Sequence, residues 1–241
     1  MIKNLRINII KRIIELNEKL IFNRRLIKFY RSEFQNNFKD VIDVGVNTGQ
    51  SIDLFLKINS GCKIVGFEPN PRLINILKKK YSSNPNIELY KKGISNSGGR
   101  RLFYENVLHS TSTFEELNPS SSYLRKKAKV LGVNKEKIIA KSYQVEVTTL
   151  WDFINSNFNS SIDLIKIDTE GHEYYCLEGL FYKNLDVEVK YIQIEEHNDD
   201  MYLNKKSFNE IEELLSFNGY EILAKIGHGF GDFQDVIFKK I

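Results

Sequence analysis

The sequence predicts a single α/β domain built on a mostly parallel sheet. From residue 38 onward, short apolar runs of strand character alternate with amphipathic helical runs, a pattern typical of parallel β-α units. A turn containing Gly45 and Gly49 follows the first of these strands, where doubly wound sheets bind nucleotides. The length of 241 residues, 41% of them hydrophobic, suffices for one sizeable core.

The first half of this domain contains three predicted strands separated by two helices. The strands are VIDVG at 41–45, KIVGFE at 63–68 and NIELYKKGIS at 86–95. The helices are SIDLFLKI at 51–58 and RLINILKKKY at 72–81, the second preceded by prolines that end a strand and start a helix. We therefore expect the carboxyl ends of these strands to share one edge of the sheet.

The second half of the domain continues the alternation of strands and helices and ends in a pair of strands. VEVTTLWDFI at 145–154 predicts a strand and then a helix, DLIKID and KYIQIEE predict strands, and helices are expected at 172–180 and 208–219. YEILAKI and DFQDVIFKK are close enough in sequence to be antiparallel neighbours. Between the halves, residues 104–145 lose the regular pattern. Long irregular segments in compact domains are usually functional or disordered, so we interpret them as an insertion over the ligand crevice, with disorder as the alternative.

Residues 1–36 are predicted to form an amphipathic helical extension that precedes a single domain of residues 37–241. The segment holds nine Lys or Arg residues against three Glu residues, with apolar residues at roughly helical spacing. A helix laid over the core with a solvated basic face is the simplest interpretation, and an oligomer contact or peripheral binding at a membrane surface is the alternative. Nucleic-acid binding is disfavoured because no aromatic and basic interleaving follows.

Composition narrows the cellular setting. Cys62 and Cys176 are far apart and belong to no C-x-x-C pattern, so no disulfide framework or thiolate metal site is indicated. No long uncharged apolar run is present, and basic residues interrupt the N-terminal apolar stretch that a secretory segment would need. We therefore expect a cytoplasmic protein, with the inner face of the membrane as a peripheral site. No feature indicates an oligomeric state.

The turn after the first strand favours a ligand without phosphate. Its spacing is Gly45-x-Asn47-x-Gly49, which lacks the third glycine of a dinucleotide fingerprint. The side chain of Asn47 can hydrogen-bond a polar amino-acid group. Asp43, at the strand end, suits an ammonium group or an ordered water and would repel a phosphate.

Two further strand ends carry polar groups. Glu68 lies 25 residues after Asp43, where a carboxylate can accept both hydroxyls of a ribose, and Pro69 continues the same predicted cofactor loop. In KIDTEGHE, Lys166 interrupts an apolar strand, so we expect it to meet a carboxylate or point into the crevice. The sequence after Lys166 crowds acidic and imidazole groups at the rim, namely Asp168, Glu170, His172 and Glu173.

At these elements the sequence resembles the FkbM-like family of S-adenosylmethionine-dependent methyltransferases. The motifs VIDVGVNTGQS, GFEPNP, VTTLWDFI, DLIKIDTEGHEYYCLEGL and IQIEEH follow the family's order over residues 41–197. The resemblance implies a Rossmann-like seven-stranded sheet with one antiparallel strand and methyl transfer to a hydroxyl of a sugar or polyketide. It also implies cofactor contacts from Asp43, Gly45, Asn47, Gly49 and Glu68, and places Asp168, Glu170 and His172 beside the reacting centre.

Methyl transfer to a hydroxyl profits from a general base, and histidine is suited to that role near neutral pH. His172 is preferred because it follows the strand-end acids, with His197 second. His228 lies in the glycine-rich GHGFG turn, where local geometry is the simpler explanation. A variant in which Asp168, Glu195 or Glu196, and His197 hold Mg²⁺ is less favoured than a metal-free site.

The acceptor class follows from the resemblance. We expect O-methylation of a sugar hydroxyl in a glycan, glycolipid or nucleotide sugar, as in polysaccharide biosynthesis. The alternative is a dinucleotide or nucleotide-sugar binding protein that uses the same crevice without methyl transfer.

Overall fold

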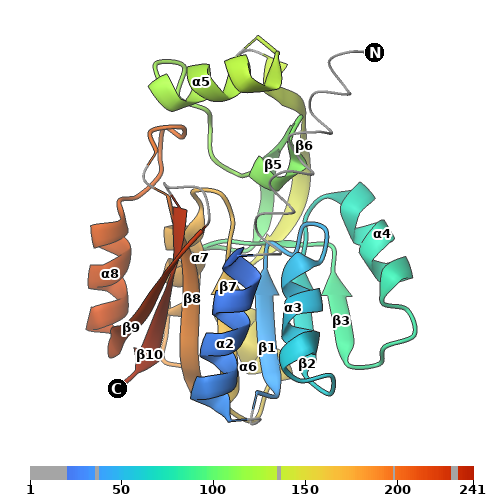
Figure 1. The fold of residues 1–241 in the computed structure, drawn as a ribbon, viewed down its shortest axis with the longest axis vertical. Coiled ribbons are helices and arrows are strands. Elements are labelled where there is room, and N and C mark those ends of the chain that lie inside the picture. The colour runs from blue at the N-terminus through green and yellow to red at the C-terminus, as the bar shows by residue number, and fades with distance from the viewer. Residues whose placement is uncertain (1–20, 36–37, 135–136, 198, 229–232) are drawn as a thin grey trace.

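The computed structural model describes the chain except for residues 1–20, 36–37, 135–136, 198 and 229–232. A seven-stranded sheet in the order β3-β2-β1-β7-β8-β10-β9 forms its centre (Figure 1). The strands have these bounds: β1 Asp40–Val44, β2 Lys63–Phe67, β3 Ile87–Tyr90, β7 Ile162–Ile167, β8 Val189–His197, β9 Tyr220–Gly227 and β10 Phe233–Lys240. The pairs among β3, β2, β1, β7 and β8 are parallel, whereas β10 is antiparallel to both its neighbours. The predicted sheet with one antiparallel strand is confirmed.

Helices cover both faces of this sheet, because its central strands are apolar on both sides. One core joins the sheet to buried residues of α6, α7 and α8, and a second joins it to buried residues of α2, α3 and α4. The helices have these bounds: α2 Asn23–Phe34, α3 Gln50–Ile58, α4 Pro71–Lys80, α6 Leu150–Asn157, α7 Glu173–Leu180 and α8 Phe208–Phe217. The expected helices are present as α3, α4, α6, α7 and α8, and expected strands are present in the main sheet as β1, β2, β7, β8, β9 and β10.

A smaller unit, here called the cap, lies over one end of the main sheet (Figure 1). It comprises residues 93–148: β4 Gly93–Ile94, β5 Gly99–Asn106, η2 His109–Thr111, α5 Ser122–Leu131 and β6 Ile139–Thr148. Its three strands form a separate sheet in the order β4-β6-β5. Buried residues of α5 pack with Met201 and Tyr202 from the loop after β8, which attaches the cap to the main domain.

The cap begins in a stretch that the sequence predicts as one strand. Residues 86–95 instead divide into β3 of the main sheet and β4 of the cap sheet. At Gly93 a Cβ atom would come within 2.3 Å of the Phe114 ring, so the backbone here is pressed against the cap. Cap contacts, which no local pattern records, thus redirect the chain.

Helix α2 lies within the predicted N-terminal extension. Its residues Leu26, Tyr30 and Phe34 are buried against the sheet, and Arg31 donates a hydrogen bond to the carbonyl oxygen of Lys57. This part of the extension therefore packs on the core, whereas residues 1–20 lie outside the described chain. In the described residues, no helix combines the length and apolarity needed to cross a bilayer.

Candidate functional site

A cavity of about 520 Å³ opens at the carboxyl ends of the central parallel strands, beneath the cap. Its strand-end part is lined by residues that follow β1, β2 and β7: Gly45, Asn47, Glu68, Pro69, Asp168, Thr169 and Glu170. Its outer part is lined by the residue that precedes α2 and by residues of the cap, the loop after β8 and the β9–β10 hairpin: Phe22, Tyr123, Lys127, Asp199, His228 and Phe233. Ligands of open α/β sheets bind at this edge.

The turn after β1 depends on its glycines. Gly45 has a φ of 89°, and a Cβ atom there would lie 1.9 Å from the carbonyl oxygen of Asp168. Asn47 also has a positive φ, of 51°, which asparagine tolerates better than most residues. Gly49 ends the turn with a φ of 84° as the N-cap of α3, and its carbonyl oxygen accepts a hydrogen bond from Tyr81. Gly45 and Asn47 line the cavity, whereas Gly49 shapes the turn from below.

Glu68 is held at the end of β2 with its carboxylate directed toward this turn. The backbone N–H groups of Asn47 and Asn70 each donate to it at 2.8 Å, one to each oxygen. Only 5% of the residue is exposed, and burial raises the pKa of its carboxyl group to about 7, against the lowering effect of those two donors. A group with this pKa changes its charge near neutral pH.

Lys166 meets carboxylates, as predicted. Its Nζ atom lies 2.9 Å from Oδ2 of Asp168 and 3.9 Å from Oδ1 of Asp43, its partner in the β1–β7 register. Burial opposes the lysine charge, but Asp168, Asp43 and Asp235 outweigh it and raise the pKa of Lys166. Asp43 is fully buried, and burial raises the pKa of its carboxyl group. Its place is beneath the cavity floor, so the expected direct cofactor contact from Asp43 is not supported.

The rim after β7 is held by a second carboxylate. Glu173 accepts hydrogen bonds from the backbone N–H groups of Thr169 and Gly171, which closes the loop into a tight turn. Within this turn Glu170 adopts a φ of 55°, and Tyr202 donates to its carboxylate at 3.1 Å. The turn thereby directs Glu170 toward the cavity.

His172 lies away from the cavity, contrary to its predicted role. It is fully buried, with Nδ1 2.6 Å from Oε1 of Glu115 and Nε2 3.0 Å from Oγ of Ser95. Both ring nitrogens thus have partners in the cap or the strand leading to it. The geometry does not support His172 as the general base, and assigns it to joining the cap to the β7–α7 loop. The side chain of His197 lies outside the described part of the structure.

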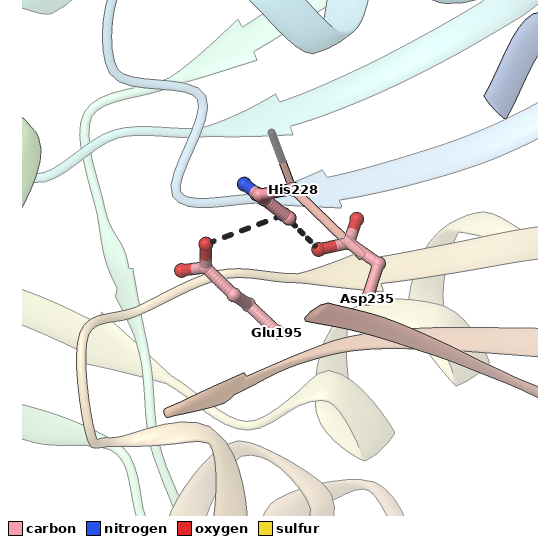
Figure 2. Close-up of side chains that lie close together, drawn as sticks. All are labelled: Glu195, His228 and Asp235. Carbon is pink, nitrogen blue, oxygen red and sulfur yellow. Dashed lines mark hydrogen bonds and ion pairs between the residues drawn. The ribbon is translucent and has the colours of Figure 1, made fainter. Parts of the chain in front are cut away.

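Among the residues that the structure describes, two groups of side chains could hold a metal ion. The ligand atoms of Asp168, Glu170 and Glu195 lie within 4.8 Å of one another, and so do those of Glu195, His228 and Asp235. Figure 2 shows the ring of His228 between the carboxylates of the second group. Carboxylates at strand ends are common without a metal, so the metal-free site stays a prediction.

Sequence reasoning missed most of the outer part of the cavity. Phe22, His228 and Phe233 come from the two ends of the chain, and Tyr123 and Lys127 come from the cap helix. In the sequence, the GHGFG turn indicates only local geometry at His228, and Lys127 lies in the basic stretch of the segment expected over the crevice. Only the fold brings these side chains to the cavity.

The comparison with protein families decides the identity. The model of the methyltransferase FkbM domain matches residues 43–222. The chain belongs to the FkbM methyltransferase family. It is therefore an S-adenosylmethionine-dependent methyltransferase.

Solved structures agree with the FkbM methyltransferase fold. Magnesium protoporphyrin IX methyltransferase from Synechocystis, with bound S-adenosylhomocysteine, has a TM-score of 0.51 at 9% identity, covering 95% of this chain and 85% of that one. The same enzyme with bound S-adenosylmethionine gives 0.50 at 9% identity, covering 91% and 78%. A putative RNA methyltransferase from Pyrococcus horikoshii gives 0.47 at 11% identity, covering 91% and 84%. The likeness to the Synechocystis enzyme shows the fold alone. No curated protein sequence matches the chain.

Proposed function

We propose that this methyltransferase transfers a methyl group to a hydroxyl of a sugar, within a glycan, a glycolipid or a nucleotide sugar. The supporting observation is the mixed lining of the outer part of the cavity. Rings of Phe22, Tyr123 and Phe233 occur there with the carboxylates of Glu195 and Asp199. A sugar presents an apolar C–H face together with hydroxyl donors, and aromatic rings and carboxylates complement these two features.

The strand-end part of the cavity fits S-adenosylmethionine. This cofactor carries an adenosine and an amino acid but no phosphate, and the wall offers a buried carboxylate, Glu68, for ribose hydroxyls. Asn47 would meet the amino-acid end beside the glycine turn. The acidic residues Glu68, Asp168 and Glu170 would repel a pyrophosphate. The residues present therefore favour this cofactor over a dinucleotide.

The bound cofactor supplies a methyl carbon activated by a positively charged sulfur. The chain then has to hold the acceptor oxygen in line with that carbon, and positioning of this kind accounts for about 7 to 11 kcal/mol in favourable cases. The cap lies over the end of the main sheet where the cavity opens, and cap residues such as Tyr123 line it (Figure 1). We assign the positioning of the acceptor to the outer part of the cavity, and that of the cofactor to Gly45, Asn47 and Glu68.

The charge around the outer part of the cavity favours the neutral sugar ring of an acceptor over an anionic group at this point. Of the basic cluster in α5, Arg125, Lys126 and Lys129 are exposed, and Lys127 lines the cavity. Burial lowers the pKa of Lys127, while Glu170, Asp199 and Glu195 act to raise it. Because these carboxylates surround the amine of Lys127 and offset its charge, this part of the cavity has little net positive charge with which to attract an anionic group of the acceptor.

Methyl transfer to purified acceptors tests the proposal. The full chain is incubated with isotope-labelled S-adenosylmethionine and with neutral sugars, sugar nucleotides and polysaccharide fractions. Mass analysis should show the gain of one methyl group on a sugar oxygen. Transfer only to a nitrogen, or to acceptors without a sugar, contradicts it.

Peripheral membrane contact remains a separate proposal for the N-terminal segment, based on its basic and apolar pattern. Flotation with anionic liposomes tests it by comparing the full chain with a chain lacking residues 1–20. Equal flotation of both chains contradicts the proposal.

A further inference from the structure

Two helices from different units of the fold border the outer part of the cavity. Helix α2 packs against the main sheet and contributes Leu26 to the cavity lining. Helix α5 belongs to the cap and contributes Tyr123, Lys127 and Val130. Figure 1 shows α5 above the end of the main sheet and α2 against the sheet below it. The cavity therefore lies between the two helices.

The exposed side of α5 combines positive charge with an apolar residue. Arg125 and Lys126 are exposed, and α5 contains no Asp or Glu. Arg125 donates one hydrogen bond to the carbonyl oxygen of Ser120, which uses only part of the donor capacity of its guanidinium group. Val130 follows Lys126 by one helical turn, so it lies on the same side of α5. It is 52% exposed at the edge of the cavity that it lines.

The start of α2 has the same combination. Arg24 and Arg25 are exposed, and Ile21, just before the helix, is 39% exposed. Phe22, between Ile21 and the two arginines, is buried and lines the cavity. Arg25 donates to the carbonyl oxygen of Gly227 at 3.1 Å, which holds its guanidinium group beside the β9–β10 hairpin. These exposed residues therefore also lie at the edge of the cavity.

We call the exposed residues on the two helices the basic border. It consists of three arginines, one lysine and two apolar residues: Ile21, Arg24, Arg25, Arg125, Lys126 and Val130.

The sign of the charge changes between the inside of the cavity and the basic border. Inside, the carboxylates of Glu170, Glu195 and Asp199 act on Lys127 from the cavity wall. Outside, neither α5 nor the first turn of α2 contains an acidic residue. An anionic group is therefore repelled from the wall and attracted to the border. An acceptor that matches both has a neutral sugar inside and negative charge outside.

The apolar residues of the border favour a membrane surface over a soluble phosphate as the source of that negative charge. Exposed apolar side chains next to cations are typical of protein surfaces that bind the interface of anionic bilayers. Ile21 and Val130 supply such side chains, and a soluble diphosphate would gain nothing from them. The cations also come from two helices of different units, which is a wider distribution than one diphosphate requires.

We propose that the basic border docks on an anionic membrane surface and that the cavity receives its sugar from a glycolipid in that membrane. This inference rests on the proposed transfer to a sugar hydroxyl and selects the glycolipid among the acceptor classes. It assigns membrane contact to α2 and α5, which the separate proposal for the N-terminal segment does not include. Lipid phosphates pair with the arginines and the lysine, and Ile21 and Val130 enter the interface. The sugar projects from the bilayer into the cavity between the two helices.

Vesicle binding by the full chain tests this surface without any turnover. The probes are vesicles of phosphatidylcholine with and without phosphatidylglycerol, and flotation measures the bound fraction. The α5 variant, Arg125→Gln with Lys126→Gln, should bind the anionic vesicles about tenfold more weakly or worse, because each cation near an anionic surface contributes to binding. The matched control, Lys78→Gln with Lys79→Gln, removes the same charge from exposed positions of α4 outside the cavity lining. It should bind within about twofold of wild type.

Three results of this experiment overturn the proposal. Wild type does not bind the anionic vesicles, or the α5 variant binds them as well as wild type does. In the third case the control loses as much binding as the α5 variant, which means that only net charge matters. All chains in the comparison contain residues 1–20, so that segment does not cause a difference between them.

A fluorescent label tests where the membrane contact lies. The two native cysteines are buried, so the variant Val130→Cys can be labelled selectively with an environment-sensitive dye. Its emission should shift to the blue when anionic vesicles are added. The control is Phe217→Cys, at the last residue of α8, which is 91% exposed and outside the cavity lining. No shift at position 130, or an equal shift at both positions, overturns the proposal.

Two further measurements separate the lipid from a soluble phosphate and from the proposed function. If calorimetry shows binding of UDP-glucose that the α5 variant loses, while anionic vesicles do not bind, the border serves a soluble phosphate and the inference is wrong. The acceptor found by the methyl-transfer screen should be methylated faster by wild type than by the α5 variant when it is lipid-linked in anionic vesicles. Equal rates overturn the glycolipid assignment. If vesicles bind as expected but no sugar hydroxyl is methylated, the proposed function fails and the docking surface stands.

Discussion

The proposed ribose contact of Glu68 predicts that cofactor binding depends on pH near neutrality. Burial raises the pKa of its carboxyl group to about 7, and ribose hydroxyls donate best to the charged form. With that pKa the charged fraction is about 0.1 at pH 6 and about 0.9 at pH 8. The Kd of S-adenosylhomocysteine should therefore be about tenfold larger at pH 6 than at pH 8.

The substitution Glu68→Gln removes the charge and keeps the size. One side-chain acceptor remains, so the loss of a charge-assisted hydrogen bond should cost about 1.5 to 3 kcal/mol, or about ten- to hundredfold in affinity at pH 8. Titration calorimetry with S-adenosylhomocysteine measures both effects. The variant should also lose the tenfold change between pH 6 and pH 8.

The raised pKa of the Glu68 carboxyl group also predicts that the free energy of unfolding depends on pH. A carboxyl group with a pKa of about 7 when folded, against 4.5 for the unfolded reference, binds more protons in the folded chain. Its contribution is therefore most favourable at low pH, and the free energy of unfolding falls as pH rises between these values. Relative to Glu68→Gln, wild type should lose about 2 to 3 kcal/mol between pH 5 and pH 8. Urea unfolding at the two pH values measures this.

Two results would refute this reasoning. Equal affinity of wild type and Glu68→Gln for S-adenosylhomocysteine at pH 8 excludes a ribose contact from Glu68. An identical pH dependence in both proteins, for binding or for unfolding, means that another group titrates.

Three further predictions concern the turn, the buried histidine and the metal. Gly45→Ala places a Cβ atom 1.9 Å from the carbonyl oxygen of Asp168, so calorimetry should show that binding of S-adenosylhomocysteine is lost or more than about tenfold weaker. The control variant is Gly227→Ala, whose added Cβ atom meets no atom within 4 Å, and it should bind S-adenosylhomocysteine as wild type does. His172→Ala leaves the Glu115 carboxylate buried without its partner, so thermal unfolding should show a loss of about 3 to 5 kcal/mol; a fully stable but inactive variant would restore His172 as base. EDTA treatment should leave turnover unchanged, and restoration by Mg²⁺ after a loss would establish the metal variant.

The strand-end features could be predicted because they depend on short-range sequence. In a parallel sheet, residues that follow successive strands lie at the same edge, and this does not depend on the conformation of distant loops. Gly45, Glu68 and Asp168 therefore reach the same cavity, as expected. Lys166 could be predicted to meet a carboxylate because an unpaired charge in an apolar strand is costly.

His172 shows where this reasoning fails. Its position two residues after Glu170 indicated the rim, but the turn held by Glu173 directs Glu170 toward the cavity while His172 bonds to Glu115 and Ser95. Those two partners lie 57 and 77 residues away in the sequence. A pattern of neighbouring residues cannot predict hydrogen bonds to partners so far away in the sequence.

The sequence by itself determined the strands of the main sheet, the order of strands and helices along the chain, and the acidic glycine-containing edge to which we assign the cofactor. These depend on alternation, spacing and the polarity of strand ends, which are properties of neighbouring residues. Only the tertiary structure decided which histidine faces the cavity. Phe22, Glu195 and His228 meet there from distant parts of the chain, because packing of α2 and the C-terminal hairpin against the sheet brings them together.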